Sequence, residues 1–178
     1  GMCQSAPANT VVNVTSDPVI SVQMPTDTMI CVGGSYAFSI VASGGVGAPT
    51  YQWYSNTTNA NTGGTSISGA NGSSYTPAVF NTVGDYYYYA MVSLSGSGCG
   101  SVASATALVH VVSDPTVTIT PSTQTICQGT TPTNLVVTPS GGVGTYSYQW
   151  YSNTSQNSYG GTLISGATGS TFTPPTDA

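Results

Sequence analysis

The side chains that could carry chemistry are few in this chain and lie far apart. There is no lysine or arginine, histidine occurs only at His110, and the four cysteines show no Cys-x-x-Cys spacing. The carboxylates are spread over the whole length, at Asp17, Asp27, Asp85, Asp114 and Asp177. Catalysis needs a nucleophile, a base and an orienting group close together, and metal binding needs clustered ligands. We therefore predict no catalytic residue, no metal site, no cofactor and no enzymatic activity.

The histidine and the two aspartates that recur have structural interpretations. His110 stands between Val109 and Val111, which is typical of a polar strand residue. Asp17 and Asp114 each lie in a Ser-Asp-Pro sequence, where aspartate favours a turn before the proline. Calcium would need several oxygen ligands, and each of these places supplies a single carboxylate. The turn is therefore the preferred interpretation of both aspartates.

The composition excludes several classes of partner. Charged residues make up 3% of the 178 residues, against roughly 25% in an ordinary soluble protein. The formal net charge is −5 and no cation is present, so we expect neither nucleic acid nor anionic lipid to bind. The longest apolar runs are far shorter than the roughly 20 residues that span a bilayer, so we expect no membrane insertion.

An internal repeat organises the sequence. The hexapeptide Tyr-Gln-Trp-Tyr-Ser-Asn occurs at residues 51–56 and again at 148–153, an offset of 97. A period of this length suits a string of modules that fold independently. We predict that residues 1–15 are the last strand of a preceding repeat, that 16–112 form a complete repeat, and that 113–178 form a second repeat that stops before its last two strands.

Alternating side chains with frequent glycine, proline and asparagine predict an all-β fold. The expected strands of the complete repeat include 19–24, 35–42, one around Trp53, 86–94 and 102–112. Short strands with a tryptophan on the third are typical of a β-sandwich of the immunoglobulin type. The residues expected in the core are Phe38, Ile40, Trp53, Tyr86 and Trp150.

Four segments in order give the sequence a family resemblance. They are TMICVGGSYAFSI, YQWYSN, VGDYYYYAMV and GSGCGS. Together they resemble the tandem immunoglobulin-like repeats of very large surface adhesins, including gliding-motility adhesins, from bacteria that use type IX secretion. The resemblance implies an extracellular location at the bacterial cell surface and a role in a stalk or adhesive filament. It implies no particular ligand.

In an exported protein of this kind the cysteines are expected to be oxidised. The candidates for disulfide formation are Cys3, Cys31, Cys99 and Cys127. Cys31 and Cys99 could pair within the complete repeat. However, the two turns that hold them lie at opposite ends of a typical sandwich, roughly 30 Å apart, whereas a disulfide needs Cα atoms within about 7 Å. Cross-linking of consecutive repeats therefore stays open as the alternative.

The tyrosine run 86–89 predicts an aromatic face. Because alternate strand residues point to opposite sides, Tyr86 and Tyr88 are expected to face the core, and Tyr87 and Tyr89 the outer surface, close to Tyr54. Such a face could stack against sugar rings or pack laterally between filaments. Cross-strand tyrosine pairs also stabilise a sheet without any ligand.

Several residues lie in sequences that accept glycans. The N-glycosylation pattern Asn-x-Ser/Thr occurs at Asn13, Asn56, Asn71 and Asn153. The sequence Asp-Thr-Met at 27–29 is similar to a bacterial O-glycosylation motif, which makes Thr28 a further candidate.

The sequence thus predicts a non-enzymatic, extracellular stalk segment of a large repetitive adhesin or filament, whose partners are neighbouring repeats. One alternative is a carbohydrate-binding module that uses the tyrosine face to bind surface glycans. Another is a pilus-like subunit, in which Val11–Val14 of one copy completes the open repeat of the next by strand addition.

Overall fold

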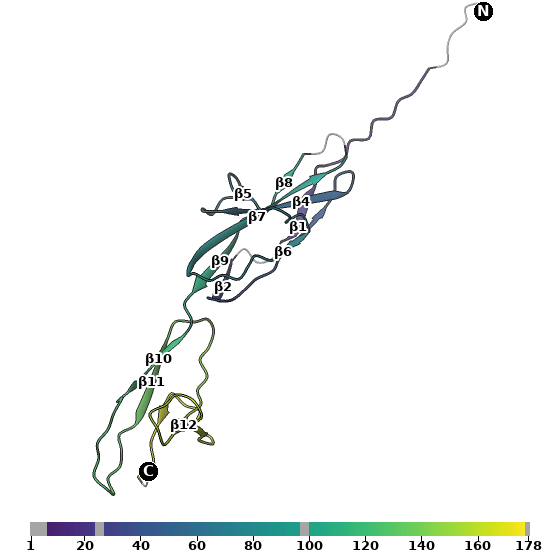
Figure 1. Cartoon of the computed structure of the whole chain (residues 1–178). Helices are drawn as coiled ribbons and strands as arrows, with labels where there is room; N and C mark the ends of the chain where they lie inside the picture. Colours follow the sequence, from purple (N-terminus) through teal and green to yellow (C-terminus); the bar gives the residue numbers. More distant parts are fainter. Residues whose placement is uncertain (1–6, 24–26, 97–99, 177–178) are drawn as a thin grey trace, which may run out of the picture. The chain divides into compact units, whose positions relative to one another are not determined.

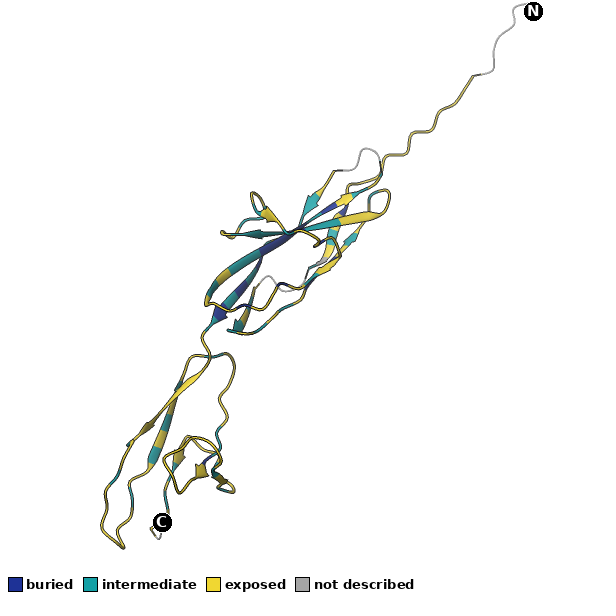
Figure 2. Ribbon diagram, viewed as in Figure 1, coloured by how far each residue is buried: buried dark blue, intermediate teal, exposed yellow. Residues whose placement is uncertain are grey.

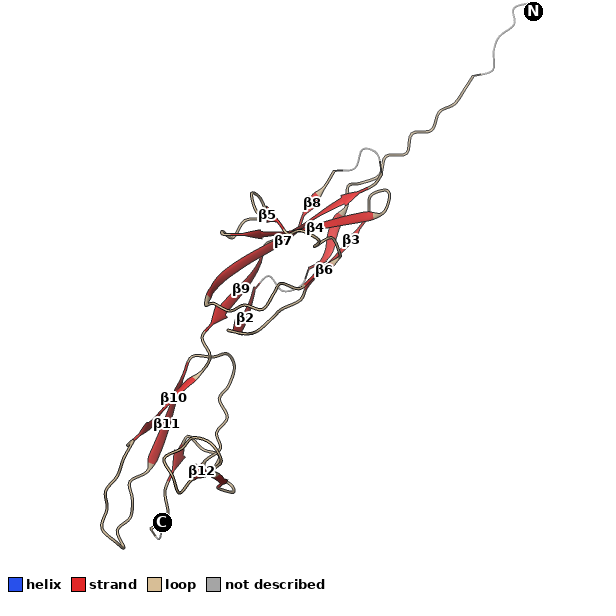
Figure 3. Cartoon of the chain, viewed as in Figure 1, coloured by secondary structure: helices blue, strands red, loops and turns tan. Residues whose placement is uncertain are grey.

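A computed structural model of the chain describes residues 7–23, 27–96 and 100–176. The described residues form strands joined by turns and loops, without a helix (Figure 3). The strands of the first repeat are β1 (Val19–Gln23), β2 (Asp27–Cys31), β3 (Phe38–Ser43), β4 (Pro49–Asn56), β5 (Thr65–Ser66), β6 (Ser74–Tyr75), β7 (Gly84–Leu94), β8 (Val102–Ala103) and β9 (Ala107–Val112). Those of the second repeat are β10 (Thr116–Thr120), β11 (Leu135–Ser140), β12 (Tyr151–Ser152), β13 (Thr162–Leu163) and β14 (Thr171–Phe172).

The first repeat is an immunoglobulin-like β-sandwich. One sheet has the order β1-β3-β6, and the other has the order β2-β9-β7-β4-β5, with β8 also paired to β7 (Figure 1). These sheets correspond to strands A-B-E and to strands A′-G-F-C-C′ of an immunoglobulin sandwich. The all-β prediction is therefore confirmed, and its immunoglobulin-like arrangement with it.

The core forms because alternate strand residues face inward. On β3 the inward residues Phe38 and Ile40 are both 2% exposed, and on β9 Val109 and Val111 are 0% and 2% exposed. Figure 2 shows buried stretches in dark blue along strands of the first repeat. Trp53, on β4, is also 2% exposed and fills the space between the sheets. The burial of these apolar side chains removes them from water and is the main force that holds the two sheets together.

Strand β2 is a feature that the sequence did not predict. It follows β1 after a short break and joins the opposite sheet, beside β9. Just after the end of β2, the amide of Val32 donates to the carbonyl of Val112 at the end of β9, over 3.0 Å. Both strands therefore finish at the same end of the sheet and run in the same direction.

The strand expected over 102–112 is divided into two. The break lies at Ser104, whose hydroxyl accepts a hydrogen bond from the amide of Ala90 (3.0 Å) and donates one to the carbonyl of Ala105 (2.7 Å). Ser104 is 2% exposed, so its side chain replaces the sheet hydrogen bonds that are lost at the irregularity.

The second repeat contains two small sheets, β10-β11-β14 and β12-β13. Trp150 is 8% exposed and stacks on Phe172, with ring centroids 5.4 Å apart. The strand expected over Val11–Val14 does not form in the described chain. These residues are exposed and have no neighbouring strand with which to pair.

The chain groups into two compact units, which interleave in sequence. Residues 29–33 and 81–83 group with the C-terminal unit (111–178), and the rest of the chain up to residue 110 forms the other. The repeat boundaries proposed from sequence stay a prediction.

Candidate functional site

The tryptophans of the repeated hexapeptide make the same contacts in both repeats. Nε1 of Trp53 donates to the carbonyl of Gly72 over 2.9 Å, and Nε1 of Trp150 donates to the carbonyl of Gly169 over 2.8 Å. Each indole therefore fixes the loop that lies 19 residues further along the chain. A buried tryptophan N–H needs such a partner, because an unpaired donor is costly in an apolar core.

The glutamines of the hexapeptide are structural too. Nε2 of Gln52 donates to the carbonyl of Ile67, and Nε2 of Gln149 donates to that of Ile164, both over 2.8 Å. The backbone amide of each isoleucine donates in turn to the carbonyl of the hexapeptide's tryptophan. The hexapeptide recurs because in each repeat it holds the equivalent loop against the core of that repeat.

The asparagine that ends the first hexapeptide anchors the loop after it. Nδ2 of Asn56 donates to the carbonyls of Ala60 (2.8 Å) and Thr62 (3.0 Å). Its Oδ1 accepts the backbone amide of Thr57 over 2.8 Å. Asn56 thus satisfies backbone groups of the loop from the inside of the turn.

Asn153 anchors the equivalent loop of the second repeat, through hydrogen bonds from Nδ2 to the carbonyls of Asn157 (3.2 Å) and Tyr159 (3.1 Å). In both repeats, Nδ2 is the atom to which an N-linked glycan would be attached. A glycan would replace one of the two Nδ2 hydrogens and so remove one of these loop contacts, and glycosylation at Asn56 and Asn153 stays a prediction.

The other glycan candidates differ in exposure. Asn13 and Asn71 are exposed, and both stay predictions. Thr28 lies within β2 and is half-buried, whereas its neighbours Asp27 and Met29 are exposed. A glycan on Thr28 would therefore project from the less accessible side of this strand.

The tyrosine face predicted from sequence is wrong at Tyr89. Tyr89 is 4% exposed, and its ring stacks on Tyr54 with centroids 5.0 Å apart and an interplanar angle of 5°. Its hydroxyl accepts the amide of Gly64 over 3.1 Å. The side of the sheet was predicted correctly, but the connection after β4 covers it. Tyr54 and Tyr87 are half-buried.

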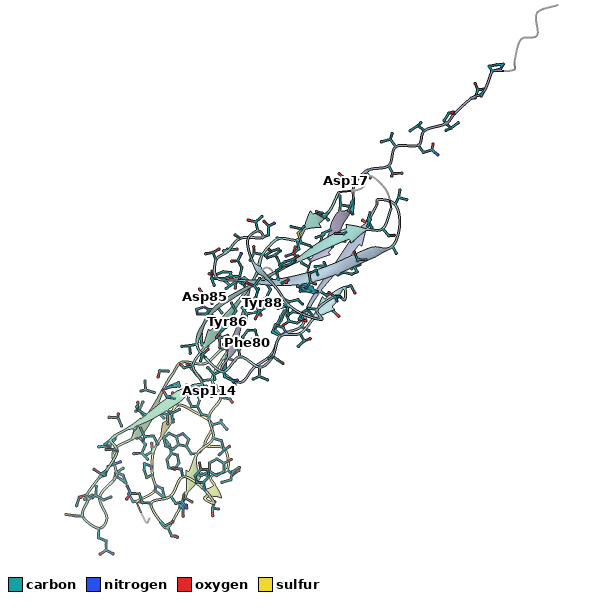
Figure 4. The ribbon with its side chains drawn as sticks, turned by 45° about the horizontal axis from the view of Figure 1, so that its top comes forward. Asp17, Phe80, Asp85, Tyr86, Tyr88 and Asp114 are labelled. Carbon is teal, nitrogen blue, oxygen red and sulfur yellow. The ribbon has the colours of Figure 1, made fainter. Side chains whose placement is uncertain are left out.

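Tyr88 lies in an aromatic cluster between the two sheets. It is 8% exposed, and its ring centroid lies 5.1 Å from that of Phe38 and 6.1 Å from that of Tyr75. Tyr86, expected in the core, is half-buried and packs on Phe80 (Figure 4). Burial, with smaller contributions from Tyr75 and Tyr86, raises the pKa of Tyr88 to about 12.

The raised pKa of Tyr88 predicts a loss of stability in alkali. Between pH 10 and about 12 the folded chain keeps the proton of Tyr88 while the unfolded chain loses it. The free energy of unfolding should therefore fall by about 1.4 kcal/mol per pH unit in this range. Urea denaturation at several pH values would measure this slope, and Tyr88→Phe should make it shallower. An unchanged slope in Tyr88→Phe would contradict the assignment.

The Ser-Asp-Pro sequences dock on the repeat that follows them. In the first repeat the amide of Gly100 donates to Oδ1 of Asp17 over 3.0 Å. In the second repeat the amide of Gly142 donates to the carbonyl of Ser113 over 3.0 Å, and a Cβ on Gly142 would lie 3.1 Å from the ring of Pro115. Both connections are therefore held by turns of the downstream repeat.

The cysteines of the described chain are not in disulfides. Cys31 is a half-buried thiol and Cys127 an exposed one, while Cys3 and Cys99 lie outside the described residues. Cys31 ends β2 beside Val112, whereas Gly100 is bonded to Asp17 near the start of the repeat. The continuous strand β7, which runs between these two ends, has 11 residues and separates them by roughly 30 Å.

Nδ1 of His110 and Oδ1 of Asp85 are hydrogen-bonded to each other between β9 and β7. Both side chains are partly exposed, so the pair contributes little to stability. Nowhere in 7–23, 27–96 or 100–176 do three possible metal ligands gather. Nor does this part of the chain contain a helix long and apolar enough to cross a membrane.

The second repeat contains a hollow of about 760 Å³. Its lining includes Val117, Ile119, Val137 and Trp150. Val117 and Ile119 are 65% and 45% exposed, although they lie on a strand equivalent to β1. In the first repeat the corresponding space is closed by β7 and β9.

The sequence matches one known protein family. The profile of one family, described as a domain of unknown function (DUF8696), matches residues 21–113 and 116–176. The chain belongs to this family. Its description assigns no activity, and the two matched ranges together cover most of the chain. No curated protein matches the sequence.

Solved structures with similar folds contain immunoglobulin domains. Immunoglobulin domains 1–5 of Sidekick-1 share 17% identity with the chain, with a TM-score of 0.48 over 72% of this chain and 26% of that one. A structure that describes Dscam isoform specificity shares 16% identity, with a TM-score of 0.42 over 90% of this chain and 39% of that one. The chain thus spans less than half the length of these structures.

Proposed function

We propose that the chain is a load-bearing segment of an extracellular stalk or filament on a bacterial surface and has no enzymatic activity. The observation that carries this proposal is the pairing of β2 with β9. Tension enters the first repeat at β1 and leaves it at the end of β9. Since β2 and β9 run in the same direction, the tension pulls them along each other, so that all their hydrogen bonds are loaded together.

The docked Ser-Asp-Pro connections support the same function. A free linker would let consecutive repeats reorient, because each flexible residue adds conformational freedom. Here the carboxylate of Asp17 is bound by Gly100, and proline fixes one backbone angle of the connection. Force that reaches such a connection therefore enters a turn of the folded repeat that follows it.

The cysteines suggest how neighbouring repeats are joined. We propose that Cys31 pairs with a cysteine outside its own repeat, in the turn between strands F and G of the repeat that follows. The support is the roughly 30 Å between the two ends of the first repeat, which exceeds the reach of a disulfide. Such links would stiffen the stalk. Secretion by a type IX system and a role in gliding rest on the sequence resemblance alone.

The exposure of the valines around residue 12 favours strand addition as a second candidate. Val11, Val12 and Val14 are 81%, 79% and 91% exposed, and at the repeat offset Val12 and Val14 correspond to the buried Val109 and Val111 of β9. An exposed segment with strand-forming residues can complete an open sheet of another molecule.

Intact mass of the native material distinguishes these proposals. For a stalk cut from a giant adhesin, we expect a mass far above 17.9 kDa after reduction. We also expect peptide mapping with a non-tryptic protease to join Cys31 to a cysteine outside residues 16–112. A mass near 17.9 kDa would contradict the stalk and favour strand addition. A Cys31–Cys99 peptide would contradict the cross-link between repeats.

A further inference from the structure

The loop after each hexapeptide has the same framework in both repeats. We call residues 57–64 and 154–161 the Asn-anchored loops. In each, the asparagine before the loop donates to the carbonyls four and six positions later. In each, the loop ends at a pair of glycines, of which the first has a φ of +73° and the second has a strand carbonyl 2.7 to 2.9 Å from where its Cβ would be.

The framework leaves the side chains at the loop tip free to differ. The anchoring bonds to Ala60 and Thr62 use only their backbone carbonyls, and the same holds for Asn157 and Tyr159 in the second loop. These are positions at which the two repeats differ, Ala against Asn and Thr against Tyr. One fixed backbone therefore presents different side chains.

Tyr159 is the most prominent of these side chains. It is 83% exposed, and its ring packs on no other aromatic ring among the described residues. It borders the hollow of the second repeat. The equivalent Thr62 is also exposed in the first repeat, where β7 and β9 are present. The position itself therefore points to solvent.

The chemistry of the loop tip selects a class of ligand. The second Asn-anchored loop offers hydroxyl and amide groups next to an aromatic ring, and it carries no charge. An exposed ring on a rigid turn loses little entropy when it stacks on a flat apolar surface. Sugar rings offer such a surface together with hydroxyl groups that match the amides. We propose that the second Asn-anchored loop binds neutral polysaccharide, with Tyr159 as the stacking platform.

This inference deepens the proposed function and rests on its extracellular location, where polysaccharides are available. It also moves carbohydrate binding away from Tyr54, Tyr87 and Tyr89, which were predicted from sequence. Repeats with the same framework and different tips would give a stalk many weak sites of different specificity. Such sites add up through multivalency when several engage one polymer.

Affinity electrophoresis of the 178-residue chain tests the proposal. The native gels contain soluble mannan, xylan, galactan or β-glucan, with alginate as the charged comparison. We expect at least one neutral polysaccharide to retard the chain, and Tyr159→Ala to weaken this binding about tenfold, the usual scale for one lost stacking contact. Tyr159→Phe should bind like the wild type, since it keeps the ring.

Matched variants in the first repeat serve as controls. Thr62→Ala should leave binding unchanged, and Thr62→Tyr should strengthen it by adding a second platform. Circular dichroism should show that Tyr159→Ala folds normally. Retardation by alginate alone, by none of the polysaccharides, or equally in Tyr159→Ala would overturn the proposal. None of these results would affect the stalk, whose mechanical test involves the fold of the first repeat and not Tyr159.

Discussion

Replacing Trp53 by alanine is expected to lower the free energy of unfolding by about 3–5 kcal/mol, a large part of the 5–15 kcal/mol that is typical of a domain. The indole is 2% exposed, and Nε1 holds the loop at Gly72. Alanine would leave a cavity next to Phe38, whose ring centroid lies 5.8 Å from that of Trp53. Urea denaturation followed by circular dichroism measures the loss.

Trp53→Phe separates the two contributions of this residue. Phenylalanine keeps most of the apolar contact but cannot donate to the carbonyl of Gly72, so the expected loss is smaller, about 1–3 kcal/mol. If the free energy of unfolding of Trp53→Ala lay within about 1 kcal/mol of the wild-type value, the core described for the first repeat would be wrong.

The second large effect is expected from proline in β2. Successive backbone N–H groups of a strand point to opposite edges, and that of Val32 points to β9. By the alternation of a strand, the N–H of Ile30, two residues earlier, is expected to face β9 as well, and that of Met29 to face away. Ile30→Pro removes a hydrogen bond of the strand pair and should cost about 2–3 kcal/mol.

Met29→Pro is the matched control for this variant. Met29 is 51% exposed, and its N–H has no role in the strand pair, so proline there should cost less than at Ile30. Ile30→Ala corrects for the lost side chain. Equal losses for Ile30→Pro and Met29→Pro would contradict the pairing of β2 with β9.

The sequence predicted those features that depend on local alternation. The pattern around Phe38 and Ile40 indicates which face of β3 is buried, and the period of 97 identifies equivalent residues such as Trp53 and Trp150. Strand β2 was missed because its sequence, Asp-Thr-Met-Ile-Cys, is short and mixed in polarity. Its partner β9 lies about 80 residues away, and no local signal specifies such a pairing.

The exposure of tyrosines could be predicted only in part. Alternation gives the side of the sheet on which Tyr89 lies, but whether that side is open depends on the connection that crosses it. The anchoring role of Asn56 could likewise not be predicted from the sequence, because its hydrogen bonds go to backbone carbonyls, which every residue possesses. The repeated asparagine and the glycine pair at a constant offset were the only available signals.

Single-molecule force spectroscopy tests the load-bearing role most directly. The chain would be attached through its two ends and stretched at constant velocity, with Ile30→Pro measured alongside it. We expect a distinct unfolding peak for the first repeat with a gain in length on the order of 300 Å, and a lower unfolding force in Ile30→Pro. Extension of the wild-type chain without a force peak would contradict the proposal that this repeat bears load.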